Sequence, residues 1–414
     1  MRRPPLEISV DENGRLILPP EVMKTLGVSP GARLLLRADR DGVHIGRSVS
    51  RLDRLYIEPT TVCNLDCRMC MHESWDEPVG NMSRETFSRI MDGLRELPQK
   101  PLLFFGGYGE PLLHPDIMTM ISEAKAAGAA VEMITNGTLL SDETCGRLID
   151  IGLDRLWISV DGTGDGAAGS MEAGVGRVTE NAGRLFRARE RELTDLPRIG
   201  MSFVATRGTI GSLPAVLRLG RRFGADRFIV SNVLAHTPEL HAQSLYEKSF
   251  YETELSPSEW TPLVELPRME VDGLTEAPLV EVLKGLFTVR IAGQDLHLGS
   301  SRCPFVEKGS MAVRWDGTVS PCLPLLHSHT SFLADRERRS LAFSVGNLAE
   351  KNLEQIWSEP SYLALRERLL AFDFPPCTLC NSCEQADSNK SDCFDSPTPA
   401  CGGCLWAQGY IQCP

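Results

Sequence analysis

Short apolar runs alternate with amphipathic segments through the middle of the chain. The runs are rich in β-branched and aromatic residues, which predicts strands, and the apolar residues between them recur at helical spacing. The predicted strands are residues 54–60, 102–105, 130–136, 155–161, 199–206 and 227–234. Strands that alternate with helices form a parallel sheet with right-handed crossovers. Because six units are fewer than the eight of a closed barrel, the pattern predicts an α/β fold built on an open, partial (β/α)6 barrel.

Residues that favour helix ends support several of the predicted helices. Ser83 and Ser141 precede helical segments as N-caps, Pro115 opens another segment and Gly128 closes it. Each of these residue types satisfies or ends the backbone hydrogen bonding of a helix terminus.

The two ends of the chain lack this alternation. Residues 6–47 contain short alternating segments with turns at Asn13-Gly14 and Asp41-Gly42, which predicts a small β-rich unit. The final stretch is rich in cysteine and poor in periodic segments, apart from a helix near residues 352–370, so we expect it to fold around metal clusters. The predicted organisation is a unit at 1–50, a barrel at 52–235, a linker or bridging region at 236–300 and a cysteine-rich domain at 301–414.

Composition and charge narrow the class of protein. Hydrophobic residues make up 42% and charged residues 24% of the 414 residues, which is typical of a soluble globular protein. We find no apolar run near the ~20 residues of a membrane helix and no signal peptide, so we expect a cytoplasmic protein without a membrane partner. The formal net charge is -12, and the basic excess is confined to residues 1–54. An acidic body argues against broad nucleic-acid binding.

The 13 cysteines are the most informative feature of the composition. Disulfides are rare in a reducing cytoplasm, and most of these cysteines fall in close groups, which indicates metal or iron–sulfur ligation. Cys145 stands apart, on one helical face with Leu148 and Ile149, and is interpreted as a structural residue.

The first group, Cys63, Cys67 and Cys70, directly follows the first predicted strand. In parallel α/β folds the carboxyl ends of the strands face the ligand site. Three thiolates can hold three irons of a [4Fe–4S] cluster and leave the fourth iron open to a ligand. A zinc site that includes His72 is the alternative, although zinc loops usually pair cysteines as C-x2-C.

The spacing Cys63-x3-Cys67-x2-Cys70 after a first strand resembles the signature of radical S-adenosylmethionine (SAM) enzymes. The resemblance covers about residues 52–234. It implies that SAM binds the open iron and is cleaved reductively to a 5′-deoxyadenosyl radical, which abstracts a hydrogen from the substrate. It also implies an external reductant such as ferredoxin or flavodoxin.

The same resemblance assigns residues to SAM. Gly-rich turns and polar strand ends are weak signals alone, since both are common in ordinary loops. Their order after the cysteine loop is what favours SAM binding. The residues implied to contact SAM are Gly106, Gly107, Gly109, Glu110, Asn136, Ser159, Asp161 and Arg207. The sequence identifies no general acid or base.

The later cysteines resemble the SPASM extension of radical SAM enzymes, which carries one or two auxiliary [4Fe–4S] clusters. A hairpin at Asp316-Gly317 is predicted to deliver one of these thiols to a cluster. Nine thiols exceed the eight that two complete clusters need, and one interval is shorter than in the family. One cluster plus a zinc ion, or a cluster with an open site, therefore remain alternatives. The candidate ligands are Cys303, Cys322, Cys377, Cys380, Cys383, Cys393, Cys401, Cys404 and Cys413.

The amino-terminal unit resembles the AbrB/SpoVT-like swapped-hairpin family in the segment VDENGRLILPPEVMKTLGVSPGARLLL. Members of that family are dimeric and many bind DNA through arginines, and Arg15 stands at a matching position. The resemblance implies a homodimer through residues 1–50, a docking site for a client or a DNA-binding unit. Fold alone does not decide among these roles.

The closing segment CGGCLWAQGYIQCP resembles a subset of radical SAM maturases associated with tungsten-dependent aldehyde oxidoreductases. The sequence therefore predicts a radical SAM maturase that modifies a peptide, a protein or a protein-bound cofactor, with such an oxidoreductase as one candidate client. A maturase of a ribosomally made peptide is the alternative within this class. An iron–sulfur redox sensor that binds DNA is the alternative from another class.

Overall fold

The computed structural model describes most of the chain. The described residues are 9–26, 34–39, 42–47, 49–75, 77–160, 172–246, 263–267, 269, 272–284, 288–291, 294–295, 302–333, 336–375, 377–378 and 383–414. Within these ranges, no helix combines the length and the apolar character that crossing a membrane requires.

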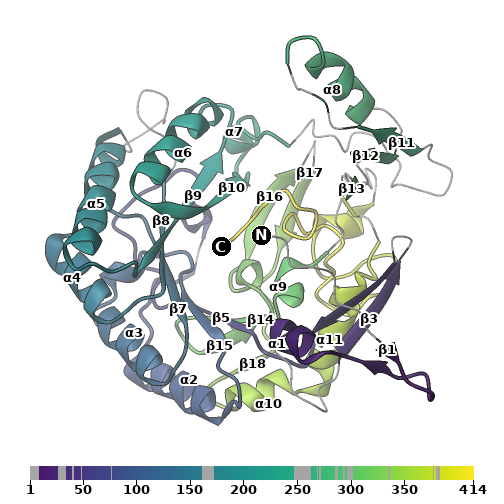
Figure 1. Cartoon of the computed structure of the whole chain (residues 1–414), viewed down its shortest axis with the longest axis horizontal. Helices are drawn as coiled ribbons and strands as arrows, with labels where there is room; N and C mark the ends of the chain where they lie inside the picture. The colour runs from purple at the N-terminus through teal and green to yellow at the C-terminus, as the bar shows by residue number, and fades with distance from the viewer. Residues whose placement is uncertain are drawn as a thin grey trace.

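All six predicted barrel strands are confirmed, with their ends shifted by up to a few residues. They are β5 (Arg54–Ile57), β6 (Leu102–Phe105), β7 (Val131–Thr135), β8 (Arg155–Ser159), β9 (Arg198–Ala205) and β10 (Ala225–Asn232). Each strand pairs in parallel with the next one along the chain. The helices lie along the outside of the curved sheet (Figure 1). They are α2 (Arg84–Glu96), α3 (Ile117–Ala126), α4 (Asp142–Asp150), α5 (Glu172–Arg191) and α6 (Leu213–Arg222).

The predicted helix ends are confirmed by hydrogen bonds. Ser83 Oγ accepts from the Thr86 N–H at 3.0 Å, and Ser141 Oγ accepts from the Thr144 N–H at 3.1 Å. Gly128 follows α3 with a φ of 82°, in the left-handed region that favours glycine. These local interactions fix where the helices begin and end, and therefore where the loops at the carboxyl ends of the strands start.

The barrel wall is a continuous hydrophobic core. The last three side chains of β5, the last three of β6 and the inner face of α2 are fully or almost fully buried. Burial of such side chains is the main stabilising term of the fold, at about 25 cal/mol per Å² of apolar surface. Cys145 is buried in α4 with the other core residues, as expected for a structural cysteine.

The cysteine-rich region extends the barrel sheet. Strand β14 (Ser310–Val313) pairs in parallel with β5, and β15 (Thr318–Ser320) and β18 (Gly346–Asn347) continue the sheet in antiparallel fashion. The predicted hairpin at Asp316-Gly317 joins β14 to β15, and Gly317 has a φ of 86°. The central sheet therefore has nine strands in the order β10-β9-β8-β7-β6-β5-β14-β15-β18.

One predicted helix is wrong in its extent. The segment near residues 352–370 forms two helices, α10 (Leu353–Trp357) and α11 (Pro360–Ala371). Pro360 lacks the backbone N–H that a continuous helix needs, so it opens the second helix instead. The short elements of this region are α9 (Pro304–Glu307), η4 (Leu323–Leu325), β16 (His329–Leu333), β17 (Arg336–Ser340) and η5 (Glu384–Asp387).

The final residues of the chain lie across the open side of the barrel. The Asn232 side chain of β10 donates to the Tyr410 carbonyl at 2.8 Å, and the Tyr56 hydroxyl of β5 donates to the Pro414 carbonyl at 2.9 Å. Because β5 and β10 are the first and last barrel strands, residues 410–414 bridge the gap between them (Figure 1).

The remaining described elements are small. The amino-terminal unit contains two hairpins and a helix, as the sequence predicts: β1 (Ser9–Val10), β2 (Leu16–Ile17), α1 (Pro20–Leu26), β3 (Leu34–Asp39) and β4 (Gly42–Arg47). The region expected to be a linker contains α7 (Pro238–His241), α8 (Glu276–Lys284) and a three-stranded sheet of β11 (Leu263–Leu266), β12 (Thr288–Ile291) and β13 (Gln294–Asp295). Three more 3-10 turns are η1 (Met71–Ser74), η2 (Pro111–Leu113) and η3 (Ile210–Ser212).

Candidate functional site

Three loops meet at the carboxyl ends of β5, β6 and β7. The Glu110 N–H, after β6, donates to the Val62 carbonyl in the cysteine loop at 2.9 Å. The Asn136 side chain, after β7, donates to Asn64 Oδ1 in the same loop at 2.9 Å. The parallel order of the strands brings these segments to one edge, where the sequence predicts the SAM site.

Residues 106–110, the glycine segment, pack so closely against the cysteine loop that Gly107 and Gly109 have no room for a side chain. A Cβ on Gly109 would lie 2.4 Å from the Thr60 carbonyl oxygen, and a Cβ on Gly107 would lie 2.7 Å from Glu58 Cγ. Neither neighbour can retreat easily, since one is backbone and the other is a fully buried side chain. The glycines therefore set the distance between the two loops.

Glu110 is a buried carboxylate held in one orientation. It accepts hydrogen bonds from Thr135 Oγ1 at 2.8 Å, from the Asn136 N–H at 2.7 Å and from the Leu112 N–H at 3.0 Å. Burial raises the pKa of Glu110, and these three hydrogen bonds oppose that rise. No Lys or Arg among the described residues forms an ion pair with it. Such a carboxylate suits an incoming ammonium group.

The three loop cysteines are half-buried on a short stretch of chain. The Cys70 N–H donates to the Cys67 carbonyl at 2.8 Å, and Asn136 Nδ2 lies 4.0 Å from Cys63 Sγ. Burial is the main cause that raises the pKa of Cys63, and the negative charge of Glu110 adds to it. A bound metal reverses this effect because it stabilises the thiolate, and three thiols are the number that the three-cysteine side of a [4Fe–4S] cluster needs.

The other residues implied to contact SAM make fewer described contacts than Glu110 does. Ser159 is the last residue of β8 and is half-buried beside Ser202 of β9. Arg207 follows β9 and is exposed, and its backbone N–H donates to the Gln243 carbonyl at 2.9 Å. Asp161 lies outside the described residues. Gly106 packs beside Ile134 of β7, within the same group of loops as Glu110.

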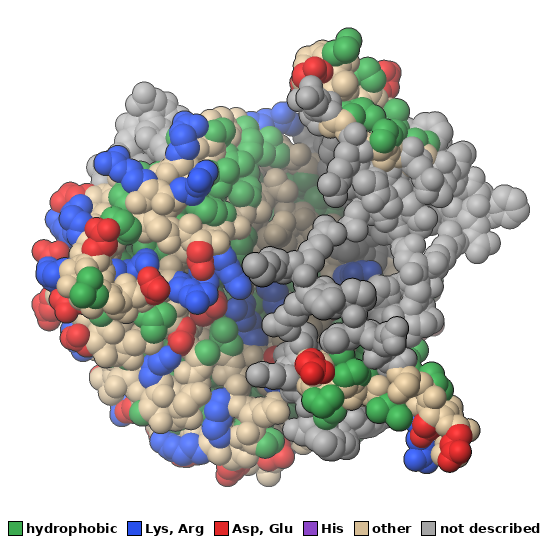
Figure 2. All heavy atoms as spheres, in the orientation of Figure 1, with side chains coloured by type: hydrophobic (Ala, Val, Ile, Leu, Met, Phe, Trp, Pro, Cys, Tyr) green, Lys and Arg blue, Asp and Glu red, His purple; other side chains and the backbone are tan. Residues whose placement is uncertain are grey.

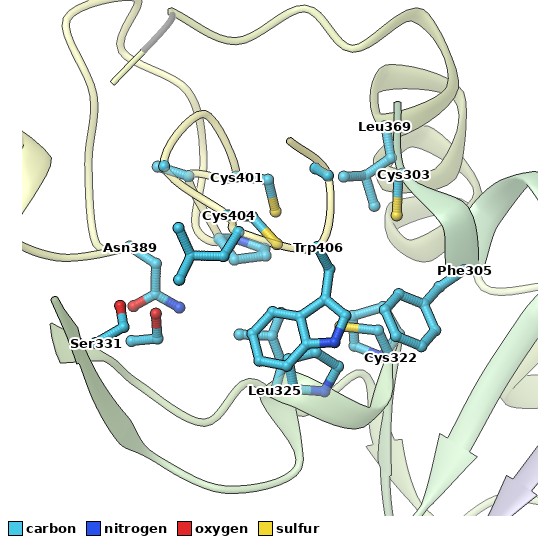
Figure 3. A pocket seen from close by; sticks show the side chains of 18 of the residues that line it. Cys303, Phe305, Cys322, Leu325, Ser331, Leu369, Asn389, Cys401, Cys404 and Trp406 are labelled. Atoms are coloured by element: carbon cyan, nitrogen blue, oxygen red, sulfur yellow. The ribbon is translucent and has the colours of Figure 1, made fainter. Parts of the chain in front are cut away.

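Four of the later cysteines line one cavity, together with apolar side chains (Figure 3). They are Cys303, Cys322, Cys401 and Cys404. Burial raises the pKa of all four thiols, and that of Cys303 reaches about 12. Four thiols in a dry cavity match the ligand count of one complete [4Fe–4S] cluster. Within the described part of the chain, no three His, Cys, Asp or Glu side chains converge as ligands of a single metal ion would.

Of the other five cysteines, the four that the structure describes do not line this cavity. Cys413 is close to it, since its Sγ accepts from Trp406 Nε1 at 3.2 Å. Cys377 and Cys383 are half-buried, and Cys393 is exposed. Cys380 lies outside the described residues. Of the eight candidate thiols that the structure describes, four therefore share one cavity.

A buried histidine that the sequence did not single out connects the two cluster regions. His327 lies between two carboxylates, with Nε2 3.0 Å from Glu58 Oε2 and Nδ1 2.7 Å from Glu77 Oε2. Its ring stacks on Trp75 at a centroid distance of 4.0 Å. The side chains of Glu58 and His327 are 0% and 1% exposed. These residues are far apart in the sequence, so no local pattern could have found them.

The electrostatics of His327 favour its protonated form. Burial by itself lowers the pKa of His327, but the hydrogen bonds and negative charges of Glu58 and Glu77 outweigh burial, so the pKa is raised. Through its ion pairs with Glu58 and Glu77, a charged His327 attaches the segment that follows η4 to the part of the barrel that carries the cysteine loop. Other charged groups at this contact are few: Arg314 Nη1 lies 3.1 Å from Glu77 Oε2.

The comparisons with known proteins agree with this arrangement. The family model of the radical SAM superfamily matches residues 57–209, and the SPASM iron–sulfur cluster-binding domain matches residues 303–384. The chain is 33% identical over 368 residues to a tungsten-containing aldehyde ferredoxin oxidoreductase cofactor-modifying protein of Pyrococcus furiosus, a match that covers 87% of this chain and 96% of that protein.

Two further similarities are more limited. A PqqA peptide cyclase of Streptomyces rochei is 31% identical over 179 residues, which covers 43% of this chain and 47% of that protein. The solved structure of native anSMEcpe with bound AdoMet aligns with a TM-score of 0.51 at 16% identity, and covers 86% of this chain and 96% of that one. This structural likeness concerns the fold.

Gly109→Ala is expected to separate the two loops and to weaken SAM binding, because its Cβ would lie 2.4 Å from the Thr60 carbonyl oxygen. We expect a loss of affinity for SAM of about tenfold or more, equivalent to about 1.4 kcal/mol, measured by equilibrium dialysis on cluster-loaded protein. Gly146→Ala, in α4 with nothing within 4 Å of its Cβ, is the matched control. Equal SAM affinity in both variants would contradict the role of the close approach.

The contact around His327 is expected to make stability depend on pH. Since the folded pKa of His327 is raised, its contribution is complete below the unfolded pKa of about 6.5 and disappears as the pH rises through the folded value. The difference in Tm between cluster-loaded wild type and His327→Gln should therefore be larger at acidic than at alkaline pH. A difference that stays constant between these conditions would show that His327 is not charged in the folded protein.

Proposed function

The chain belongs to the radical SAM superfamily and carries a SPASM domain, and we propose that it modifies the cofactor of a tungsten-containing aldehyde oxidoreductase. The observation that carries the proposal is the similarity to a protein described as modifying this cofactor. That similarity extends over 96% of the relative and therefore includes both the barrel and the cysteine-rich region. Membership of the family means that the enzyme uses a [4Fe–4S] cluster with SAM, as well as auxiliary iron–sulfur clusters.

The loops at the carboxyl ends of the strands supply the binding groups for this activity. We assign Cys63, Cys67 and Cys70 to the SAM-binding cluster, which supplies one-electron cleavage of SAM when bound. Glu110 receives the SAM ammonium group, because it is an oriented, buried carboxylate without a described cation beside it. Asn136 links the cysteine loop to the end of β7 and keeps that edge closed.

The cavity with four cysteines is assigned to one auxiliary cluster. Phe305, Leu325 and Trp406 make its wall largely apolar, which keeps water away from the thiolates. Its complete set of four thiols favours a role in electron transfer over direct binding of a substrate. A second auxiliary site would be built from Cys377, Cys380 and Cys383. The external reductant would be a protein such as ferredoxin or flavodoxin.

A maturase of a ribosomally made peptide is the second candidate. The similarity to a PqqA peptide cyclase favours it, but this similarity covers less than half of the chain. Cofactor maturases and peptide maturases both need the residues that cleave SAM, and this common need accounts for the region that the chain shares with the cyclase. For the amino-terminal unit we propose either a homodimer contact or a docking site for a protein client.

The proposal is tested in two stages. Anaerobically reconstituted protein with SAM and dithionite should release 5′-deoxyadenosine, and Cys67→Ala should abolish this because two thiolates cannot hold the SAM-binding cluster. Cys145→Ala, a buried cysteine of α4 outside both sites, should retain it. Tungsten aldehyde oxidoreductase produced with and without the enzyme should then yield cofactors of different mass. Identical cofactors would exclude this client, and activity in Cys67→Ala would exclude the radical SAM assignment.

The assignment of the auxiliary cavity has its own test. Cys404→Ala should lower the iron content by about four atoms per chain, since it removes one of four ligands of a single cluster. The control Cys145→Ala should keep the wild-type iron content. Iron and acid-labile sulfide analysis, with electron paramagnetic resonance of the reduced protein, measures the change. A Cys404→Ala protein with full iron content would place the auxiliary cluster on other thiols.

A further inference from the structure

A second cavity lies at the opposite end of the barrel from the cysteine loop. Its lining includes the first residues of β5 and β6, the early residues of β10, and Lys308, which follows α9. We call this cavity the amino-terminal mouth, because it opens at the amino-terminal ends of the parallel strands. Its volume is about 660 Å³, which is within the range of sites for small molecules and cofactors.

The carboxylates around the amino-terminal mouth are already paired with arginines. Asp53 pairs with Arg51 at 2.5 Å, and Asp226 pairs with Arg155. Glu132, just inside the barrel, accepts from Arg54 at 3.1 Å. It also accepts from Trp157 Nε1 at 3.0 Å. Glu132 and Asp226 each also lie within 4.0 Å of a second arginine, Arg155 and Arg198 respectively, so arginines compensate the carboxylates at this end of the barrel.

Two cations of the lining have no such partner. Arg227 and Lys308 form no ion pair with any described residue, and the closest polar contact of Lys308 is the Cys413 carbonyl oxygen, 3.5 Å from its Nζ. Three basic and two acidic side chains line the cavity, so it has a basic excess of one although the chain has a formal net charge of -12. Lys and Arg side chains gather along the edge of the central hollow in the space-filling view (Figure 2).

We propose that the amino-terminal mouth binds the phosphate group of a small phosphorylated molecule through Arg227 and Lys308. A guanidinium and an ammonium together supply several N–H donors, which match the oxygens of a phosphate. Trp157 provides apolar wall beside these donors, so a ring attached to the phosphate would also find contact area. The volume suits a cofactor-sized molecule and is too small for a folded protein partner.

This inference deepens the proposed function. It rests on that function in one respect, because the proposed function identifies the ligand as the cofactor of the client. Lys308 is five residues after Cys303, whose thiol lines the auxiliary cavity. Its Nζ also contacts the segment that carries Cys413. A phosphate anchored at the amino-terminal mouth would therefore hold its molecule at the junction between the barrel and the auxiliary unit. Neither the family match nor the similarity to relatives assigns these residues a role.

The experiment uses cluster-loaded full-length protein and inorganic pyrophosphate as the probe, with affinity measured by isothermal titration calorimetry. Arg227→Gln and Lys308→Gln should each weaken binding about tenfold, as expected for one charge-assisted contact of about 1.4 kcal/mol. Arg222→Gln, an exposed arginine on α6 outside the cavity, should bind as wild type does. Because the two cations lie on different elements, Arg227→Gln preserves the test if Lys308→Gln fails to fold.

Two results would overturn the inference. One is equal pyrophosphate affinity in wild type, Arg227→Gln and Lys308→Gln. The other is a hexaglutamate peptide that binds more tightly than pyrophosphate and loses affinity in the same variants, which would make the amino-terminal mouth a site for acidic peptides. Failure of the proposed function is distinguishable, because loss of SAM cleavage with retained pyrophosphate binding would remove the radical assignment and leave the anion site.

Discussion

The parallel pairing of β14 with β5 is the constraint on which the arrangement of the two cluster regions depends. It adds the cysteine-rich unit to the barrel sheet, and the hairpin between β14 and β15 returns the chain to the amino-terminal end of β5. Cys303 precedes this hairpin and Cys322 follows it, so both thiols reach the same cavity. Since a backbone ladder is rigid, the distance between the auxiliary cavity and the cysteine loop is fixed by strand length rather than by a flexible linker.

The two units are held together again at the carboxyl end of the same strand. His327 from the cysteine-rich unit is inserted between Glu58, directly after β5, and Glu77, after the cysteine loop. A buried ion pair costs desolvation energy, and loss of one partner leaves the other charge buried and uncompensated. Here Glu58 also packs against Gly107, so the histidine, the carboxylate and the glycine segment form one continuous contact. The segment 410–414, which bridges β5 and β10, completes the closure of the barrel on its open side.

Burial and positive charge divide the interior into chemically different regions. The thiols of the auxiliary cavity are in an apolar environment that raises the pKa of each, and a bound metal would offset this rise by stabilising the thiolates. Glu110 presents an oriented negative charge to the SAM side of the barrel. The amino-terminal mouth presents surplus positive charge at the other end of the strands.

The sequence by itself determined the elements whose signals are local. The six strands, the caps at Ser83 and Ser141, the hairpin at Gly317 and the cysteine loop all follow from neighbouring residues, whose spacing dictates backbone geometry. Pro360 was a local signal that the helix predicted near residues 352–370 is broken, but the regular spacing of apolar residues on both sides obscured it. Only the tertiary structure decided which four of the eight described candidate thiols share a cavity, where His327 lies, and that Arg227 and Lys308 have no ion-pair partner among the described residues. These features depend on contacts between residues up to hundreds of positions apart. Sheet pairing and burial bring such residues together, and the sequence shows no regular spacing that would reveal the contacts.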